Sequence, residues 1–428
     1  MTTQLTILDW QGVLVADAAT VGGKAWQLAR LRQFGLPVPD GLVIPAGWRP
    51  LHDGEAALSP ALLDILREAL AARDWLNRPL AVRSSAAGED SAKASFAGIY
   101  RSCLNVCGLE QAQLAIREVW GSLWSPAAIA YRQKLGLAED SILPGMAVII
   151  MPLLPAVASG IAFTCDPLSG RDDRLVIHAQ WGFGESLVGG KTAGDEYVFS
   201  EDPLDDHWVL LHQQMGSKAA KAVTRPGGGT ETIATPAAQA GVFVLSSDQA
   251  LYLAELLRDA AVALDFTNSF YDLEWVWDGN QFWLTQARPV TARPRYTYDA
   301  LQAQPTYWTR GNTCEAMPEP MSPIDWSSAR KMVNALLMQS YLLAGYPSLP
   351  GAQRAGLFFG RLYLDLSMLQ WEIYDALSML PKATNALLGG RQPEIAIPAA
   401  SLGDRVARAR RVVNYMLRAP ARRRRGLE

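Results

Sequence analysis

Residues 272–289 have the sequence DLEWVWDGNQFWLTQARP. Two apolar runs, 272–277 and 281–286, flank the turn residues Asp278-Gly279-Asn280. Aromatic and β-branched runs on either side of such a turn predict a β-hairpin. With the turn closed at Gly279-Asn280, Glu274 on the first strand and Gln286 on the second are expected to lie near each other.

The polar residues of this hairpin predict a magnesium site. Alternation along a strand places Glu274 on the face of Asp272, and Gln286 on the face of Leu284 and Arg288. A carboxylate and an amide oxygen suit Mg²⁺, which keeps waters and takes its other ligands from substrate phosphates. Arg288 would then stand beside the metal, where phosphate charge collects.

A glycine-rich turn precedes a predicted helix near the N-terminus. Gly22-Gly23-Lys24 is followed by apolar residues at helical spacing up to Gly35. Glycines let the backbone approach an anion such as phosphate closely, and the start of a helix offers N–H groups without intrahelical partners. The lysine adds a positive charge for phosphate. An ordinary surface turn is the alternative interpretation, and the pattern is not a Walker A loop.

An arginine ends a short apolar strand at Leu80-Ala81-Val82-Arg83. Small and hydroxyl-bearing residues follow, and then Ser95-Phe96-Ala97-Gly98. Arg83 is placed to bind phosphate oxygens through two hydrogen bonds, under a flexible cover. The competing interpretation is a solvated loop in which Arg83 pairs with Glu89 or Asp90.

Two further segments are each open to two interpretations, as part of a nucleotide site or as an ordinary turn. The apolar strand 159–163 runs into Thr164-Cys165-Asp166, a hydroxyl and a carboxylate that either line a phosphate pocket or cap a turn. The glycines of 181–190 allow tight passage of the backbone, which a turn between strands also explains.

Together these five elements resemble, in order, the N-terminal nucleotide-binding domain shared by phosphoenolpyruvate synthase, pyruvate phosphate dikinase and rifampin phosphotransferase. The resemblance covers roughly residues 10–292. Residues 310–323, RGNTCEAMPEPMSP, resemble the segment that opens the middle domain of the rifampin phosphotransferase-like branch. The fold class that this implies is α+β: an ATP-grasp module followed by a mainly helical C-terminal segment.

The resemblance also implies roles for individual residues and a domain plan. ATP and Mg²⁺ are the implied cofactors, and the implied ligand residues are Lys24, Arg83, Gly98, Ser102, Thr164, Glu274, Gln286 and Arg288. Lys24, Arg83 and Arg288 would hold phosphates and perform the catalysis, while Glu274 and Gln286 would bind the metal. The expected plan is a two-subdomain nucleotide-binding domain at 1–292, a linker at 293–306 and the start of an acceptor-related domain at 307–428.

The sequence departs from the family at two places. Met151 stands where the family usually has a glutamine near the adenine. The glycine-rich, histidine-bearing loop of the swivelling domain, which carries the phosphoryl group in this family, is missing from the sequence. The four histidines are His52, His178, His207 and His212, and none lies in a nucleophile or metal-binding pattern. A separate phosphohistidine-domain protein or a missing C-terminal domain is therefore the expected partner.

The expected function is that of a dikinase-type phosphotransferase component, which passes a phosphoryl group from Mg-ATP to a histidine elsewhere and then to a small molecule. A direct ATP-grasp kinase or ligase, and a silent nucleotide sensor, are the alternatives. A net charge of −3 argues against nucleic acid or a membrane surface as partner. No apolar run reaches the roughly 18 residues of a membrane span. Four scattered cysteines and the lack of a signal peptide favour the cytoplasm.

Overall fold

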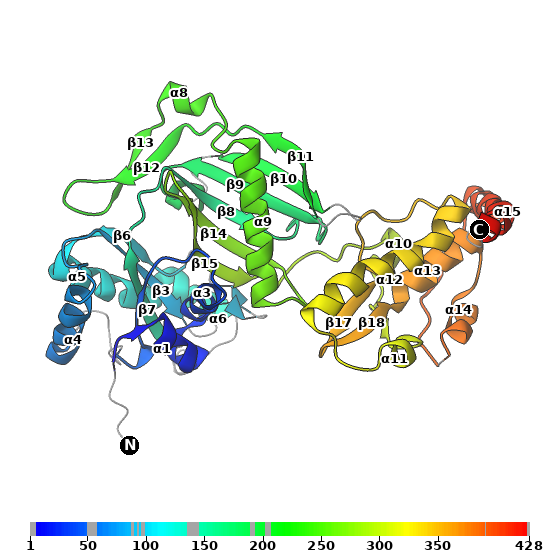
Figure 1. Cartoon of the computed structure of the whole chain (residues 1–428), viewed down its shortest axis with the longest axis horizontal. Helices are drawn as coiled ribbons and strands as arrows, with labels where there is room; N and C mark the ends of the chain where they lie inside the picture. Colours follow the sequence, from blue (N-terminus) through cyan, green and yellow to red (C-terminus); the bar gives the residue numbers. More distant parts are fainter. Residues whose placement is uncertain are drawn as a thin grey trace, which may run out of the picture.

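The computed structural model describes residues 6–48, 58–86, 90–91, 94–95, 99–134, 145–188, 193–201, 207–389 and 391–425. Its N-terminal two thirds contain two antiparallel sheets with helices packed against them, and its C-terminal third is mainly helical (Figure 1). The expected α+β class is confirmed. The proposed domain boundaries at 292 and 306 stay a prediction.

The first sheet has five strands, all antiparallel to their neighbours. In spatial order they are β1 (Leu8–Asp9), β2 (Leu42–Ile44), β7 (Met146–Pro152), β3 (Leu80–Ala86) and β6 (Ser102–Val106). Leucines at helical spacing on α4 (Pro60–Ala71) and apolar residues of α5 (Gly108–Gly121) cover one face. After α5 the chain makes a short turn at Ser122–Trp124, and α6 (Pro126–Lys134) then begins at a proline, which suits the first turn of a helix.

The second sheet has six strands and carries the predicted hairpin at one edge. In spatial order they are β11 (Trp208–Gln214), β10 (Asp195–Glu201), β9 (Arg174–Trp181), β8 (Ala158–Phe163), β14 (Tyr271–Trp277) and β15 (Phe282–Pro289). The small hairpin of β12 (Ala220–Thr224) and β13 (Thr230–Ala234) lies beside the end of β9, where Gln180 Nε2 donates to the Ala220 carbonyl. Two short strands, β4 (Asp90–Ser91) and β5 (Ala94–Ser95), pair with each other.

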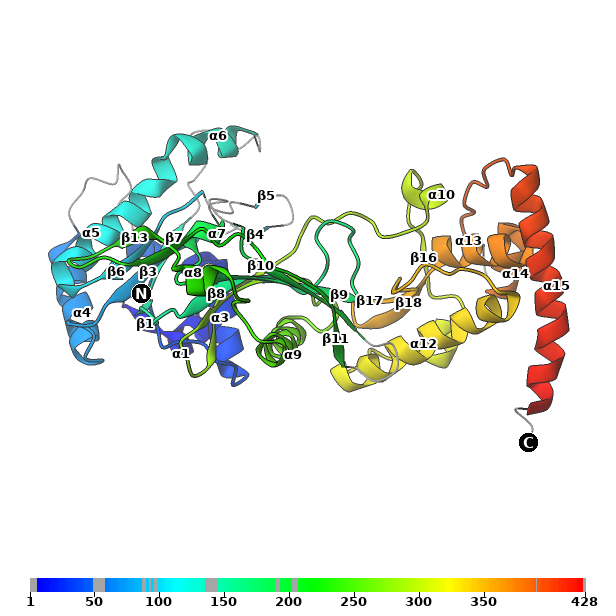
Figure 2. The same ribbon diagram turned by 90° about the horizontal axis from the view of Figure 1, so that it is seen from above.

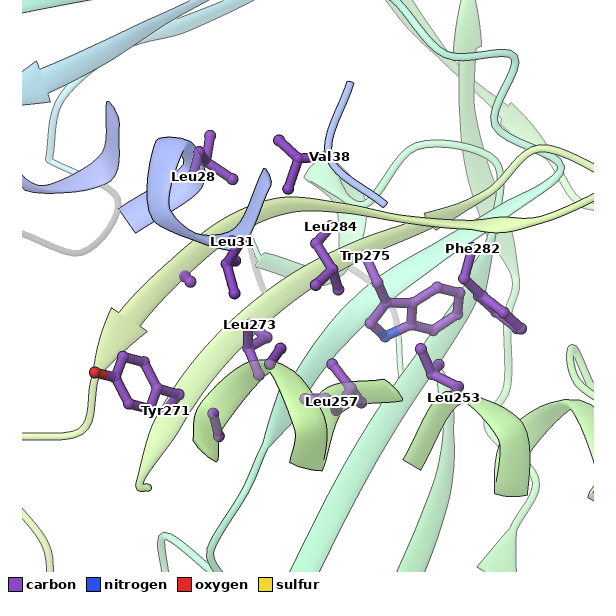
Figure 3. Close-up of a cluster of buried hydrophobic side chains, with 14 of the residues drawn as sticks. Leu28, Leu31, Val38, Leu253, Leu257, Tyr271, Leu273, Trp275, Phe282 and Leu284 are labelled. Carbon is purple, nitrogen blue, oxygen red and sulfur yellow. The ribbon is translucent and has the colours of Figure 1, made fainter. Parts of the chain in front are cut away.

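One apolar core ties the two sheets together. Helix α9 (Ser247–Leu264) crosses the second sheet, and α3 (Gly23–Gln33) packs against β15, as Figure 3 shows. Leu28 and Leu31 of α3, Leu253 and Leu257 of α9, and Leu273, Trp275 and Leu284 of the hairpin meet there. Burying such side chains stabilises each by about 1.5–3 kcal/mol, so the hairpin is held firmly where it meets α3.

The remaining helices of the N-terminal part are short. They are α1 (Trp10–Val15), α2 (Ala18–Val21), η1 (Ala46–Trp48), α7 (Glu185–Val188) and α8 (Ala237–Ala240).

The C-terminal third is mainly helical, as predicted, and also contains a small sheet that the sequence interpretation missed. Its helices are α10 (Asp299–Gln302), α11 (Thr313–Ala316), α12 (Pro323–Ala344), α13 (Leu366–Leu377), α14 (Pro381–Leu387) and α15 (Leu402–Arg425). The sheet has the order β16 (Trp308–Thr309), β18 (Arg361–Asp365), β17 (Ala355–Phe358). Helix α15 lies at the far end from the two large sheets (Figure 2).

Candidate nucleotide site

The hairpin aligns two pairs of polar residues across its strands. Glu274 lies opposite Gln286, and Asp272 lies opposite Arg288. The register then shifts by one residue, because a bulge leaves Trp275 opposite Leu284. The expectation that Gln286 shares a face with Leu284 is therefore wrong: the extra residue, Thr285, turns Leu284 into the apolar core.

Arg83 reaches this hairpin from the other sheet. Its guanidinium forms an ion pair with the Glu274 carboxylate through Nη2, and Nη1 donates to the carbonyl oxygen of Thr285 at 2.7 Å. Arg83 and Glu274 are separated by 191 residues in sequence. Arg83 thus has a distant partner, and the side chains of Glu89 and Asp90, its alternative partners, lie outside the described part of the chain.

Glu274 stays ionised because cations surround it. Burial alone would raise the pKa of its carboxyl, but the charge and hydrogen bond of Arg83, together with the charges of Lys24 and Arg288, outweigh burial and lower the pKa. Its side chain is 20% exposed. Three cations thus surround the Glu274 carboxylate, and cations gathered in this way can bind phosphate oxygens.

Arg288 is held by Asp272, a residue to which the sequence interpretation gave no role. The Arg288 Nε donates to the Asp272 Oδ2 at 2.7 Å, and Nη2 pairs with the same oxygen. Burial raises the pKa of the Asp272 carboxyl, and the Arg288 charge opposes that rise. The position of Asp272 directly opposite Arg288 in the predicted hairpin was the signal that could have found this pair.

Lys24 stands on the first turn of α3, whose start is fixed against β3. Gly22 precedes this helix with φ +77°, and a Cβ on it would overlap the carbonyl and hydroxyl oxygens of Ser85. The Ser85 hydroxyl donates to the Val21 carbonyl at 2.8 Å and accepts from the Ala25 N–H at 3.1 Å. Gly22 is therefore required by this close approach, which carries Lys24 towards Glu274.

The other predicted ligand residues have mixed outcomes. Ser102 lies on β6 directly opposite Arg83. Gly98 lies outside the described residues. The Thr164 hydroxyl donates to the Ser269 carbonyl at 2.7 Å and accepts from the Tyr271 N–H at 2.8 Å, so it ties two loops together as in the capping interpretation. Met151 is buried in the core shared by the two sheets.

The described histidines do not gather at this site. His178 lies inside strand β9, where burial lowers its pKa, and His207 and His212 are exposed near β11. His52 lies outside the described residues. Within the described part of the chain, no three His, Cys, Asp or Glu side chains cluster as a metal-binding group.

Sequence comparison settles the family. The family described as "Pyruvate phosphate dikinase, AMP/ATP-binding domain" matches residues 53–305, more than half of the chain. The chain belongs to this family. Arg83, Glu274, Gln286 and Arg288 lie within the matched residues, and Lys24 lies before them.

Characterised relatives are much longer than this chain. The prodigiosin synthesizing transferase PigC of Serratia marcescens is 30% identical over 334 residues, which cover 73% of this chain and 35% of PigC. The phosphoenolpyruvate synthase of Deinococcus radiodurans is 33% identical over 306 residues, 67% of this chain and 39% of that enzyme. The chain therefore spans little more than a third of either relative.

Solved structures are similar only at a distance. The D-alanine–D-alanine ligase from Bacillus anthracis matches with a TM-score of 0.28 and 10% identity, over 67% of this chain and 60% of the ligase. An ATP-grasp ligase, PsnB, matches with a TM-score of 0.24 and 11% identity, over 65% of this chain and 53% of PsnB. The family assignment rests on the match to residues 53–305.

None of the described helices is long and apolar enough to cross a bilayer.

Proposed function

We propose that this chain is the ATP-dependent component of a dikinase-type phosphotransferase. It would bind Mg-ATP and pass a phosphoryl group to a histidine on a separate domain or chain, and from there to a small-molecule acceptor. The observation that carries the proposal is the meeting of Arg83 from one sheet with Glu274 from the other, beside Arg288 and the helix that bears Lys24.

The phosphates of ATP would be bound by the three cations. Arg83 and Arg288 each present a planar guanidinium that can donate two parallel hydrogen bonds, and Lys24 adds a point charge at the start of α3. Phosphoryl transfer needs little covalent help from the protein, so positioning and charge neutralisation by these groups would supply most of the rate enhancement. Ser102, opposite Arg83, and Gly98 belong to the proposed cover over the nucleotide.

The donor chemistry at the hairpin fits Mg²⁺. Glu274 supplies an ionised carboxylate and Gln286, directly opposite, an amide oxygen, both of the hard-oxygen type. Two protein ligands suit a metal that takes its remaining ligands from water and phosphate. When bound, the metal would neutralise phosphate charge during transfer.

Binding of the nucleotide would exchange partners within the cluster. In the structure Arg83 is paired with Glu274, and Arg288 with Asp272. Phosphate oxygens would compete for the guanidinium of Arg83, which would leave the Glu274 carboxylate oxygens available to the metal. The bond from Arg83 to the Thr285 carbonyl can persist through this exchange and keep the arginine in place.

The phosphoryl acceptor would lie outside the described residues of this chain. His178 is enclosed in a strand, and His207 and His212 stand near β11 rather than on the hairpin that bears Glu274. A phosphohistidine-domain protein is therefore the proposed partner. The cytoplasm is the proposed compartment, which agrees with four cysteines that are all free thiols.

Labelled ATP tests the proposal directly. The chain alone should bind Mg-ATP and turn it over slowly, and adding a phosphohistidine-domain protein should place an acid-labile, base-stable phosphate on that partner. A matched partner with its histidine replaced by alanine should remain unlabelled. Rapid transfer from the isolated chain straight to a small molecule would contradict the proposal and favour a direct kinase.

A further inference from the structure

Helix α15 packs against the rest of the molecule through its charged face. Arg408 donates from Nε to Asp375 Oδ1 at 3.0 Å, and Arg411 donates from Nη1 to Asp375 Oδ2 at 3.1 Å. The guanidinium groups of Arg408 and Arg411 also lie over the rings of Tyr374 and Tyr346. An ordinary surface helix turns its apolar side inward, so α15 has the reverse orientation.

The outward face of α15 is apolar. Large hydrophobic side chains there are between 53% and 77% exposed; we call them the α15 stripe, and they are Leu402, Val406, Val413, Met416 and Leu417. The steps from 402 to 406, 413 and 416 follow the repeat of 3.5 residues that is typical of helices packed side by side. A contiguous apolar face of this size on a protein surface marks an interaction site.

Cations border the α15 stripe. Arg405, Arg410 and Arg418 are exposed beside it, and the one acidic residue of the helix, Asp404, is bonded to Ser401 at the helix start. Two α15 stripes facing each other would bring arginines together, which disfavours that pairing. The matching surface should combine apolar side chains with carboxylates.

Such a surface exists at the start of α12. A groove of about 410 Å³, the α12 groove, is lined by Met317, Pro318, Glu319, Pro320, Met321, Ile324, Asp325, Ser328, Ala329 and Met332. Its two charged lining residues are both acidic. Ile324 and Met332 are 79% and 50% exposed, so the groove presents apolar surface to solvent.

The helix cannot fill the groove of its own chain. Asn414 of α15 lies against Gly345, just beyond the other end of α12. From Met332 to Gly345 a helix extends about 20 Å, so the α15 stripe and the α12 groove of one molecule are held apart. Figure 2 shows α15 crossing the end of α12 that is distant from the groove.

We infer that the α15 stripe of one copy docks in the α12 groove of a second copy. The apolar side chains of the stripe enter a groove lined by methionines, and the arginines beside them meet Glu319 and Asp325. The same contact made in both directions closes a two-fold dimer and buries two such surfaces at once. Charge complementarity selects this pairing over stripe against stripe.

Sedimentation equilibrium on the full chain tests this inference, at concentrations spread around a dissociation constant on the order of 1 μM. Val413→Glu on the stripe and Met332→Glu in the groove should each weaken the dimer at least tenfold. Leu114→Glu, at an equally exposed leucine of α5, is the matched control and should leave the dimer unchanged. Circular dichroism establishes that each variant is folded.

A charge exchange tests the pairing itself. Arg410→Glu and Glu319→Lys should each weaken the dimer, and the double variant should recover most of the loss. A chain that stays monomeric throughout overturns the inference. A dimer whose dissociation constant is unchanged by Val413→Glu overturns it as well. A monomer that binds vesicles of anionic lipid through the α15 stripe also overturns it.

Discussion

Replacing Glu274 by glutamine should abolish transfer and leave the fold intact. The substitution preserves shape and an oxygen that can accept from Arg83, while it removes the predicted anionic ligand of the metal. The Arg83–Glu274 pair has side chains 17% and 20% exposed, between a surface and a fully buried ion pair. Loss of its charge should therefore cost about 1–2 kcal/mol of unfolding free energy, because Arg83 keeps its bond to the Thr285 carbonyl.

The effect on activity should be larger than the effect on stability. Removing one preorganised charged group from a site of phosphoryl transfer typically lowers kcat by about 10²–10³, equivalent to roughly 3–4 kcal/mol. Isothermal titration should also show that ATP affinity in the variant no longer rises when Mg²⁺ is added. The melting temperature should fall by only a few degrees, at about 2–4 °C per kcal/mol.

The Arg171–Asp173 pair supplies the matched control for this substitution. Its side chains are 18% and 13% exposed, and it lies away from the hairpin. Asp173→Asn should lower the melting temperature by a similar amount and leave ATP turnover unchanged. Near-normal turnover in Glu274→Gln, or an equal loss of turnover in Asp173→Asn, would refute the assignment of Glu274 as the metal ligand.

Three other substitutions test the site and its surroundings. Arg83→Lys and Arg288→Lys should each weaken Mg-ATP binding by roughly tenfold in titration calorimetry, because lysine keeps the charge and loses the planar fork; a large loss of thermal stability without nucleotide would instead indicate a structural role. Gly22→Ala should cost more than about 3 kcal/mol in chemical denaturation, since its Cβ has no room. At Gly35, which has φ +82° and open space, the same change should cost only about 1–2 kcal/mol. Asp365→Asn should stabilise the protein at pH 7 by up to about 2 kcal/mol and have little effect near pH 4. Burial raises the pKa of the Asp365 carboxyl to about 6, so the folded protein loses stability as the pH rises from about 4 to about 6 and this carboxyl ionises. Urea titrations at both pH values would measure the difference.

The hairpin was predictable because its information is local. Turn residues at 278–280 between two apolar runs set the closure, and the closure brings Glu274 to within one residue of Gln286. The bulge at Thr285 was not predictable from alternation, since an extra residue in one strand leaves no mark in the period of either. Glu274 and Gln286 were expected to lie near each other, and the bulge places them directly opposite, because counting back from the turn without it would pair Glu274 with Thr285.

Contacts between distant segments set the limit of the sequence interpretation. Arg83 finds Glu274 across 191 residues, and nothing local to Arg83 distinguishes that partner from the acids of its own loop. The strands β17 and β18 were missed for another reason. Phe359 and Gly360 connect them with φ values of 52° and 73°, and phenylalanine is not a residue that signals such a turn.

The charge pairs of the cluster explain how three cations can lie together before any phosphate arrives. Partly buried cations without counter-charges would repel one another and lose solvation, so Glu274 and Asp272 act as stand-ins for phosphate oxygens. Arg83 belongs to one sheet and Glu274 to the other, so their ion pair also joins the two sheets. If phosphate takes Arg83 from Glu274, one link between the sheets is replaced by a link through the ligand. The affinity for nucleotide would then depend on the free-energy difference between the ion pairs within the protein and those between the protein and phosphate. Each variant at Arg83 or Glu274 should therefore change the contact between the sheets as well as the binding of ATP.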